Sequence, residues 1–415
     1  MTDSESHRHQ LTIARLGAQG DGVAEAGGGQ VFVPYTLPGE RVTIEPEGAG
    51  RARLVAIEAA SPDRVPPVCR HFGRCGGCAV QHVAPSLYRA WKRASVAAAF
   101  SARGLEANIG DLIEPNGLRR RATFSARRTS AGTMLGYHEA ASHELVDLAE
   151  CPVLEPAIVS ALPALRALVA PLMPRKGEAR VNVTMTNGGL DVAIADVERE
   201  LTAELRTYLA SLAERARIAR LSIGRDPLFA SLAPELTFGT VDVQPPPGAF
   251  IQAVAAAEDA MAGVMLAAAG KSKSVADLFC GIGAFTFRLA GRAKVFAADS
   301  EPEAVEAIAK AVKTARGLKP ITVIRRDLFR EPLSPLELKD FDAVVFDPPR
   351  AGAEAQARMI ARSKVKTVVA ISCNPATLAR DARILVDGGY AIESVTPIDQ
   401  FRYSAHVEAV AVFRR

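Results

Sequence analysis

Hydrophobic and polar positions follow three different patterns along this 415-residue chain. Over residues 11–59, short alternating or β-branched runs are separated by Gly-rich and Pro-Gly turns, which predicts a small β-barrel. Residues 119–245 alternate strand-like pieces with one clear helix near 199–215, which predicts a mixed α+β domain. From residue 254, apolar strand runs alternate with helical segments, a pattern typical of a largely parallel, doubly wound α/β sheet.

The boundaries between these stretches follow from the proline content. Three prolines within residues 61–69 exclude a helix or a central strand there, so a linker should follow the barrel. We therefore expect three domains, which are a barrel over 1–60, a middle domain over 61–245 and an α/β domain over 246–415. A helix near 86–105 should pack on the last of these.

Composition and charge narrow the class of protein. Hydrophobic residues make up 48% of the chain and charged residues 23%, as in a globular protein. The uncharged apolar stretch 261–270 is far short of the ~20 residues that a membrane span needs, and residues 1–10 lack the apolar core of a signal peptide. We expect a cytoplasmic monomer without membrane contact. The net charge of +4 is too small to indicate nucleic-acid binding, so local clusters must decide.

A glycine turn in the last third suits a nucleoside-bearing ligand. Gly281 and Gly283 follow a predicted strand and let the backbone approach a ligand closely, although a tight turn without a ligand would have the same sequence. Asp299 lies 22 residues after Asp277, at the end of the next strand, where a carboxylate can accept hydrogen bonds from ribose hydroxyls. Asp327 ends the strand after that. Without a phosphate-binding lysine motif, these three acids favour S-adenosylmethionine over ATP.

Two further strand ends carry a carboxylate and a thiol. Asp347 and Cys373 each follow an apolar strand, so both should lie at the carboxyl edge of the sheet. A single cysteine is most often an inert buried residue, but the polar turn after Cys373 argues for a reactive one. Glu408 lies within an apolar final strand, where a carboxylate is costly unless it is paired or functional; the alternative is a surface carboxylate on an edge strand.

Four motifs carry a family resemblance. In order along the chain, DLFCGIGAF, FDPPRAG, SCNP and DQFRYSAHVE resemble those of the S-adenosylmethionine-dependent RNA uracil-5 methyltransferases. The resemblance implies a Rossmann-like methyltransferase domain, with Cys373 as nucleophile and Glu408 as general base. The cofactor contacts that it implies are Gln252, Phe279, Gly281, Gly283, Asp299, Asp327 and Asp347. Val254 and Ala284 depart from the family, because asparagine is common at both positions.

The chemistry of that family explains these residue types. Addition of a thiolate to C6 of uracil turns the ring into an enolate whose C5 can attack a sulfonium methyl group. A base must then remove the C5 proton so that the cysteine can leave. Arg350, beside the DPP turn, is expected to stabilise the enolate oxygen or to bind a phosphate.

Four of the other five cysteines form a second group, and the fifth, Cys280, lies in the glycine turn. Cys69, Cys75 and Cys78 lie within ten residues and Cys151 follows later, which supplies four thiolates. Spacing alone suits a zinc site and a [4Fe-4S] cluster equally. The family resemblance favours the [4Fe-4S] cluster, in a structural role.

RNA binding is predicted from charge clustering and from the barrel. Five arginines fall within ten residues, namely Arg119, Arg120, Arg121, Arg127 and Arg128, although exposed arginines on a strand are often only solvated. Residues 11–42 resemble the TRAM domain, an OB-like RNA-binding module. Within the family that the chain resembles, a TRAM-like barrel together with an iron–sulfur cluster implies 23S ribosomal RNA as the substrate. Uridine 54 of transfer RNA is the nearest alternative, and a non-catalytic iron–sulfur RNA-binding module is the alternative of another class. A cytosine-5 methyltransferase is disfavoured because the proline-cysteine motif is absent.

Overall fold

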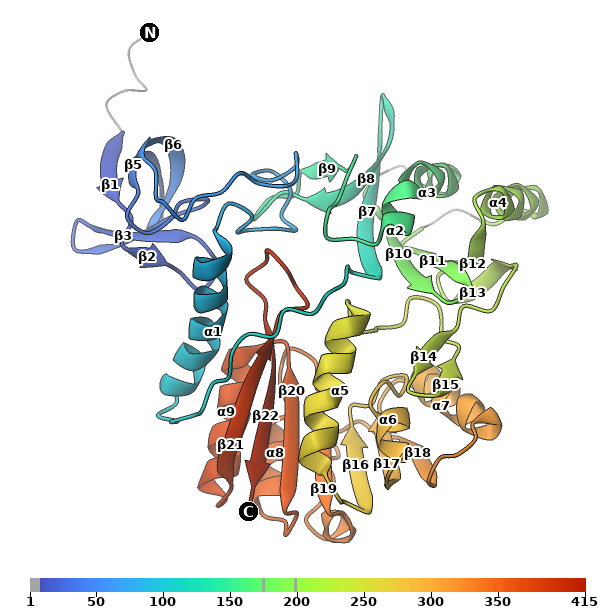
Figure 1. Cartoon of the computed structure of the whole chain (residues 1–415). Coiled ribbons are helices and arrows are strands. Elements are labelled where there is room, and N and C mark those ends of the chain that lie inside the picture. Colours follow the sequence, from blue (N-terminus) through green and yellow to red (C-terminus); the bar gives the residue numbers. More distant parts are fainter. Residues whose placement is uncertain (1–7, 174–175, 198–199) are drawn as a thin grey trace. The chain divides into compact units, whose positions relative to one another are not determined.

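The computed structural model describes residues 8–173, 176–197 and 200–415, and it divides the chain into two compact units (Figure 1). The first unit consists of the chain up to Ser95, Tyr137–Val146 and Phe401–His406, and the second consists of Val96–Gly136, Asp147–Gln400 and Val407–Arg415. The three-domain division stays a prediction, because each unit gathers several separate stretches of sequence. Within the described ranges, no helix is long and apolar enough to cross a membrane.

The N-terminal region forms a six-stranded sheet in the order β1-β5-β6-β4-β3-β2. Its strands are β1 His9–Thr12, β2 Arg15–Leu16, β3 Gly22–Ala26, β4 Gly29–Val33, β5 Arg41–Gly48 and β6 Arg51–Ala59. The alternation in the sequence decides which side chains face inward, so that Val42 and Ile44 are buried and share a small core with Ile13, Val33 and Ala52. The segment predicted as a barrel is therefore a curled β-sheet with its own apolar core.

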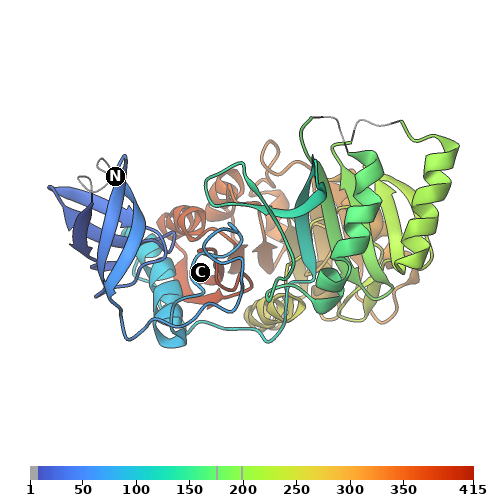
Figure 2. The ribbon, with the colours of Figure 1, turned by 90° about the horizontal axis from the view of Figure 1, so that it is seen from above.

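The middle of the chain forms a seven-stranded sheet in the order β13-β12-β11-β10-β7-β8-β9. Its strands are β7 Arg121–Thr129, β8 Gly132–His138, β9 Leu145–Asp147, β10 Ala179–Thr186, β11 Gly189–Ala195, β12 Ile218–Ile223 and β13 Asp226–Ala230. The helices of this region are α2 Pro156–Ser160, α3 Leu162–Val169, η1 Ala170–Leu172 and α4 Ala203–Arg215. Figure 2 shows α3 and α4, in green and yellow-green, beside one face of this sheet.

Helix α4 corresponds to the helix predicted near 199–215. It begins at Ala203 because the side chain of Thr202 caps it, accepting a hydrogen bond from the Leu205 amide at 3.3 Å. The predicted start at residue 199 lies outside the described residues. A two-stranded sheet of β14 Leu236–Phe238 and β15 Val241–Val243 follows.

The last third forms a seven-stranded sheet in the order β18-β17-β16-β19-β20-β22-β21. Its strands are β16 Ser274–Leu278, β17 Lys294–Asp299, β18 Ile321–Arg325, β19 Ala343–Phe346, β20 Thr367–Ser372, β21 Ala391–Ile398 and β22 Glu408–Arg414. Strands β16 to β20 are parallel, whereas β22 lies antiparallel between β20 and β21. The predicted doubly wound sheet is confirmed.

Helices cover both faces of this sheet. They are α1 Pro85–Ser101, α5 Ala255–Ala269, α6 Thr286–Ala290, α7 Pro302–Thr314, η2 Glu337–Asp340, α8 Glu354–Ala361 and α9 Pro375–Asp387. Met261, Phe287 and Ile308 from α5, α6 and α7 belong to the core on one face. The core on the other face contains Ile360 and Leu385 from α8 and α9. Two covered faces leave the carboxyl edge of the strands as the place where polar side chains can converge.

Candidate active site

A cavity of about 590 Å³ lies at the carboxyl edge of the parallel strands. Eight of the residues predicted from the sequence line it, and these are Gln252, Phe279, Gly281, Asp299, Asp347, Arg350, Cys373 and Glu408. They come from segments more than 150 residues apart, so the convergence is a product of the fold. Gly283 and Asp327 are not among the lining residues.

The glycine turn after β16 is held by the acid at the end of β17. Both Phe279 and Gly281 have positive φ, of 59° and 52°, which lets the turn fold back toward the sheet. The Gly281 amide donates a hydrogen bond to Asp299 Oδ2 at 2.8 Å. A side chain at Gly283 would place its Cβ 2.7 Å from the Phe287 ring, so this glycine serves packing and not the cavity.

Two exposed aromatic side chains in the cavity were not predicted. Phe329 lies next to Phe279, with ring centroids 5.3 Å apart, and Phe250 lines the same cavity. The Asp327 carboxylate accepts a hydrogen bond from the Phe329 amide at 3.0 Å, so Asp327 shapes the loop that carries this ring. Periodicity cannot distinguish exposed aromatic residues at a site from aromatic residues of the core, so Phe250 and Phe329 could not be predicted from the pattern.

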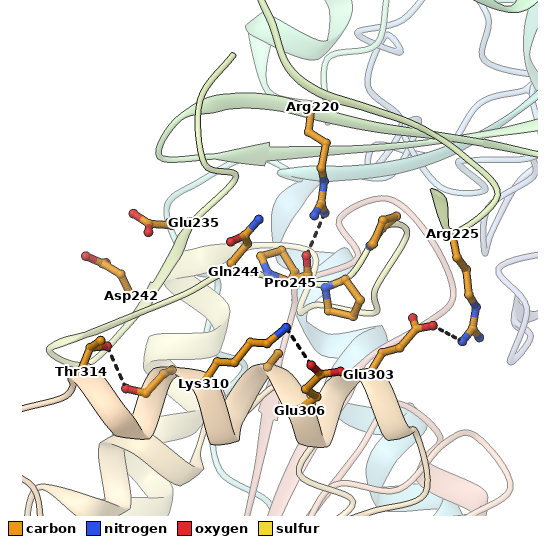
Figure 3. A pocket seen from close by; sticks show the side chains of 14 residues that line it. Arg220, Arg225, Glu235, Asp242, Gln244, Pro245, Glu303, Glu306, Lys310 and Thr314 are labelled. Atoms are coloured by element: carbon orange, nitrogen blue, oxygen red, sulfur yellow. Dashed lines mark hydrogen bonds and ion pairs between the residues drawn. The ribbon is translucent and has the colours of Figure 1, made fainter. Parts of the chain in front are cut away.

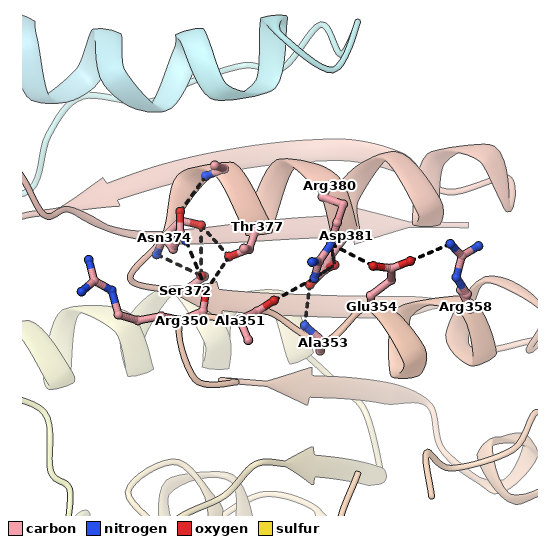
Figure 4. Close-up of polar contacts among 11 residues, drawn as sticks. Arg350, Ala351, Ala353, Glu354, Arg358, Ser372, Asn374, Thr377, Arg380 and Asp381 are labelled. Carbon is pink, nitrogen blue, oxygen red and sulfur yellow. Dashed lines mark hydrogen bonds and ion pairs between the residues drawn. The ribbon is translucent and has the colours of Figure 1, made fainter. Parts of the chain in front are cut away.

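Hydrogen bonds join the turn that carries Cys373 to the turn that carries Arg350 (Figure 4). Asn374 caps α9 by accepting a hydrogen bond from the Ala376 amide, and its Nδ2 donates to the Arg350 carbonyl at 3.1 Å. Thr377 Oγ1 donates to the same carbonyl at 3.2 Å. The thiol and the guanidinium therefore belong to two loops that are fixed to each other.

The Cys373 thiol is half-buried, and its environment disfavours the thiolate. Its pKa is raised to about 11, first by burial and then by the negative charges of Glu408 and Asp347, whereas Arg350 lowers it. A positive charge placed in the cavity would oppose both acids. The structure thus holds a thiol that a cationic ligand would activate.

Glu408 is buried at the start of β22, and it does not lie on an edge strand. The surface-carboxylate alternative is therefore wrong, because β22 is paired on both sides. Gln400 Nε2 donates a hydrogen bond to Glu408 Oε1 at 2.6 Å. Burial raises the pKa of Glu408 to about 7 and, together with the charge of Glu408, raises the pKa of Asp347 well above its usual range. A carboxylate with a pKa near neutrality is suited to accept a proton.

The model of the tRNA (uracil-5-)-methyltransferase family matches residues 190–415, which is more than half of the chain. The chain belongs to the RNA (uracil-5-)-methyltransferase family. An uncharacterized RNA methyltransferase of Brucella suis is 49% identical over 416 residues, covering 100% of this chain and 99% of the relative. The 23S rRNA (uracil(1939)-C(5))-methyltransferase RlmD of Chromohalobacter salexigens is 33% identical over 427 residues, covering 98% of this chain and 89% of the relative.

A solved structure has the same fold as this RNA (uracil-5-)-methyltransferase. The Pyrococcus abyssi tRNA (uracil-54, C5)-methyltransferase, in complex with S-adenosyl-L-homocysteine, superposes with a TM-score of 0.75 at 23% identity, covering 98% of this chain and 100% of that one. Together these matches identify an enzyme that methylates RNA with S-adenosylmethionine, against the alternative of a non-catalytic RNA-binding module.

The cavity of the methyltransferase fits a nucleoside-bearing cofactor. Phe279 and Phe329 offer ring faces, and Asp299 presents a carboxylate at the end of β17. The two positions that depart from the family carry side chains without hydrogen-bonding groups. Val254 is the N-cap of α5 without a side-chain cap hydrogen bond, and Ala284 packs against the core.

The five arginines predicted to bind RNA do not form one basic patch. Strand alternation separates Arg127 from Arg128, and the Arg127 side chain forms an ion pair with Glu178. Arg120 forms an ion pair with the buried Glu258, at 2.7 Å. Arg121 is largely buried, with its guanidinium 5.1 Å from the centre of the Phe250 ring, and burial lowers its pKa. Of the five, Arg121 contacts a ring that lines the cavity. RNA contacts by all five arginines stay predictions.

We expect the Arg120 side chain to stabilise the folded state. Its Nε donates to the Gln252 carbonyl at 3.2 Å while its guanidinium pairs with Glu258, so Arg120→Ala leaves a buried carboxylate with one partner fewer. We expect the free energy of unfolding to fall by ~3 to 5 kcal/mol, measured by urea denaturation. The matched change Arg127→Ala breaks a more exposed pair and should cost less than ~1 kcal/mol. Equal losses in the two variants would contradict this reading.

The predicted cysteine site is not visible as a metal-binding group. Cys69, Cys75 and Cys78 belong to the first unit and Cys151 to the second. In the part of the chain that the structure describes, no three His, Cys, Asp or Glu side chains are grouped as a metal ion requires. The loop itself is fixed, because the Gly76 amide donates to the His138 carbonyl at 2.8 Å. The [4Fe-4S] cluster therefore stays a prediction from the sequence.

A second cavity, of about 420 Å³, adjoins the rim of the first (Figure 3). The buried Arg220 binds Asp191 with two hydrogen bonds of 2.8 and 2.7 Å and donates a third to the Pro245 carbonyl at 2.8 Å. Arg225 pairs with Glu303 at 2.7 Å. These contacts fix the run of three prolines that leads to Phe250. The residues around the second cavity therefore stabilise one wall of the active-site cavity.

Proposed function

We propose that this enzyme methylates C5 of a uridine, with Cys373 as the nucleophile and Glu408 as the base. The observation that carries the proposal is that this thiol and this buried carboxylate line one cavity with the glycine turn and Asp299. S-adenosylmethionine supplies a methyl group on a positively charged sulfur. Cys373 adds to C6 of the uracil, C5 takes the methyl group, and Glu408 then removes the C5 proton.

The charges around the thiol support this order of events. Burial and the charges of Glu408 and Asp347 favour the thiol form of Cys373, whereas Arg350 and the sulfonium of a bound cofactor would favour the thiolate. Nucleophile activation would then follow cofactor binding. Arg350 is placed to stabilise the negative oxygen of the enolate that the addition forms.

The residues that we propose to hold the cofactor are those that line the glycine-turn side of the cavity. Asp299 would accept hydrogen bonds from ribose hydroxyls, and Phe279 with Phe329 would contact the purine ring. Gln252 and Asp347 would lie near the methyl-bearing end, because both are close to Glu408 through hydrogen bonds.

RNA containing 5-fluorouridine tests this mechanism. Its fluorine cannot leave as a proton, so the reaction should stop at a methylated adduct that joins the RNA to Cys373 and survives denaturation. Mass spectrometry of the digested complex would place the bond. A wild-type enzyme that forms no adduct, while it methylates ordinary RNA, would refute the covalent route.

We further propose 23S ribosomal RNA as the substrate. The support is the 33% identity to the Chromohalobacter salexigens RlmD over nearly the whole chain, with the TRAM-like N-terminal sheet. Transfer RNA is the alternative, because the similar Pyrococcus abyssi enzyme is a tRNA (uracil-54, C5)-methyltransferase. Nucleoside mass spectrometry of the two RNA pools from a strain without the gene decides between them, because 5-methyluridine should fall only in the ribosomal pool.

The [4Fe-4S] cluster has a spectroscopic test. If Cys69, Cys75, Cys78 and Cys151 hold it, anaerobically purified protein should be brown, with broad absorbance between the near-ultraviolet and the visible range. Substitution of Cys75 by serine should remove the colour. A colourless protein with stoichiometric zinc would instead show that the four thiolates form a zinc site.

A further inference from the structure

A buried glutamine joins the two ends of the active site. Gln400 is 1% exposed and follows β21. Its Nε2 donates one hydrogen bond to Glu408 Oε1 at 2.6 Å and another to Gln252 Oε1 at 2.7 Å. Gln252 Nε2 donates in turn to Asp347 Oδ2 at 2.8 Å. Two acids are thus connected through two carboxamides. The motifs contain these residues but did not indicate the hydrogen bonds that join them.

The orientation of the Gln400 carboxamide is determined by its neighbours. Its oxygen accepts a hydrogen bond from the Ala253 amide at 2.9 Å, so all three of these bonds are satisfied at once. A flipped carboxamide would set its oxygen against the Glu408 carboxylate and its nitrogen against an N–H donor. Because neither contact is favourable, only one orientation fits, and it directs an N–H group at the base.

We propose that Gln400 is a positioning residue that keeps Glu408 ionised and aimed at the C5 proton, and that couples this base to Gln252. The proposal rests on the proposed function of Glu408. In the step that it serves, the C5–H electrons become the C5=C6 double bond, the C6–S bond breaks, Cys373 leaves as thiolate and Glu408 takes the proton. A donated hydrogen bond favours the ionised form of a carboxylate, which must be present before the step.

The other titratable and charged groups near Glu408 are Asp347 after β19, Cys373 after β20 and Arg350. After burial, the charge of Glu408 raises the pKa of both Asp347 and Cys373, whereas Arg350 lowers the pKa of Cys373. Burial disfavours the ionised form of Glu408. The N–H group of Gln400 is therefore the specific contact that offsets burial at this carboxylate.

The substitution Gln400→Met tests the proposal, because methionine fills the space without donating a hydrogen bond. Loss of the donor should move the acid limb of the pH profile of kcat to higher pH by ~1 unit, which makes the rate roughly tenfold lower on the acid side. At high pH the rate should approach that of the wild type, and KM for S-adenosylmethionine should change little. The adduct with 5-fluorouridine RNA should form as in the wild type, because the methyl group is transferred before the base acts.

A second buried glutamine provides the matched control. Gln356 is fully buried on α8, and its carboxamide makes two hydrogen bonds with the Leu333 backbone, away from the cavity lining. Gln356→Met should lower the thermal unfolding temperature without moving the pH limb. If Gln400→Met is too unstable, Gln400→Asn keeps the carboxamide but is one methylene too short to reach all three partners, and it should shift the limb in the same direction.

The outcomes separate the two proposals. If the acid limb of the pH profile of kcat moves to higher pH and adduct formation is unchanged, the role of Gln400 is supported. A rate that falls equally at every pH, or a limb that does not move, overturns it and leaves Glu408 as base. Failure of the wild type to form the adduct would instead refute the covalent mechanism, and the role of Gln400 with it.

Discussion

Replacing Cys373 with serine should lower uridine methylation by ~10⁴-fold or more, because a hydroxyl group in this acidic cavity cannot supply the anionic nucleophile. The fold should survive, since the change keeps the size of a half-buried side chain and the Asn374 cap of α9 does not involve the sulfur. Single-turnover transfer of a labelled methyl group to RNA measures the effect.

Binding of S-adenosyl-L-homocysteine is the control for this variant. Calorimetry should give a dissociation constant within about threefold of the wild type, because Asp299 and the glycine turn are unchanged. A Cys373→Ser enzyme that still methylates at more than about a hundredth of the wild-type rate would exclude cysteine as the nucleophile.

Replacing Glu408 with glutamine should have a different signature, namely slow turnover by roughly 10³-fold with accumulation of a methylated covalent adduct on ordinary RNA. Glutamine keeps the shape but cannot accept the proton, so the reaction stops after methyl transfer. Denaturing electrophoresis with a labelled methyl group would reveal the adduct.

If Glu408 is the base, its ionisation should also determine the pH profile of kcat in the wild-type enzyme. Burial raises the pKa of Glu408 to about 7, and the carboxylate must be ionised to act, so kcat should fall as the pH drops below about 7. The control is Glu393→Gln, which removes an exposed pair with Arg414 at 2.7 Å and should retain activity within about twofold. If Glu408→Gln turns over without an adduct, another residue is the base.

The parts of the fold and site that were predictable are those with local signals. The doubly wound sheet followed from apolar runs of the right length, and Asp299, Asp347 and Cys373 followed from their positions at strand ends. Gln252 and Phe279 were predicted from the family resemblance. The arginine cluster shows the limit of counting charges, because strand alternation already implied that Arg127 and Arg128 face different ways. Whether an arginine such as Arg120 meets a buried acid depends on a partner 138 residues away.

Gln400 illustrates the same limit more sharply. It stands between Asp399 and Phe401, one polar and one apolar neighbour, and nothing in the pattern distinguishes it from a solvated glutamine. Its role comes from three partners, of which Gln252 is 148 residues away. Such contacts are fixed by tertiary packing, and periodicity carries no information about them.

The place of β22 between β20 and β21 has a kinetic consequence. Both neighbours precede β22 in the sequence, so during synthesis they emerge before the strand that separates them. Until β22 pairs, each presents an open edge that can pair wrongly, and the base is not yet in the cavity. Recovery of catalysis after dilution from denaturant should therefore lag behind recovery of helix content, because Glu408 reaches the cavity only when β22 is paired on both sides.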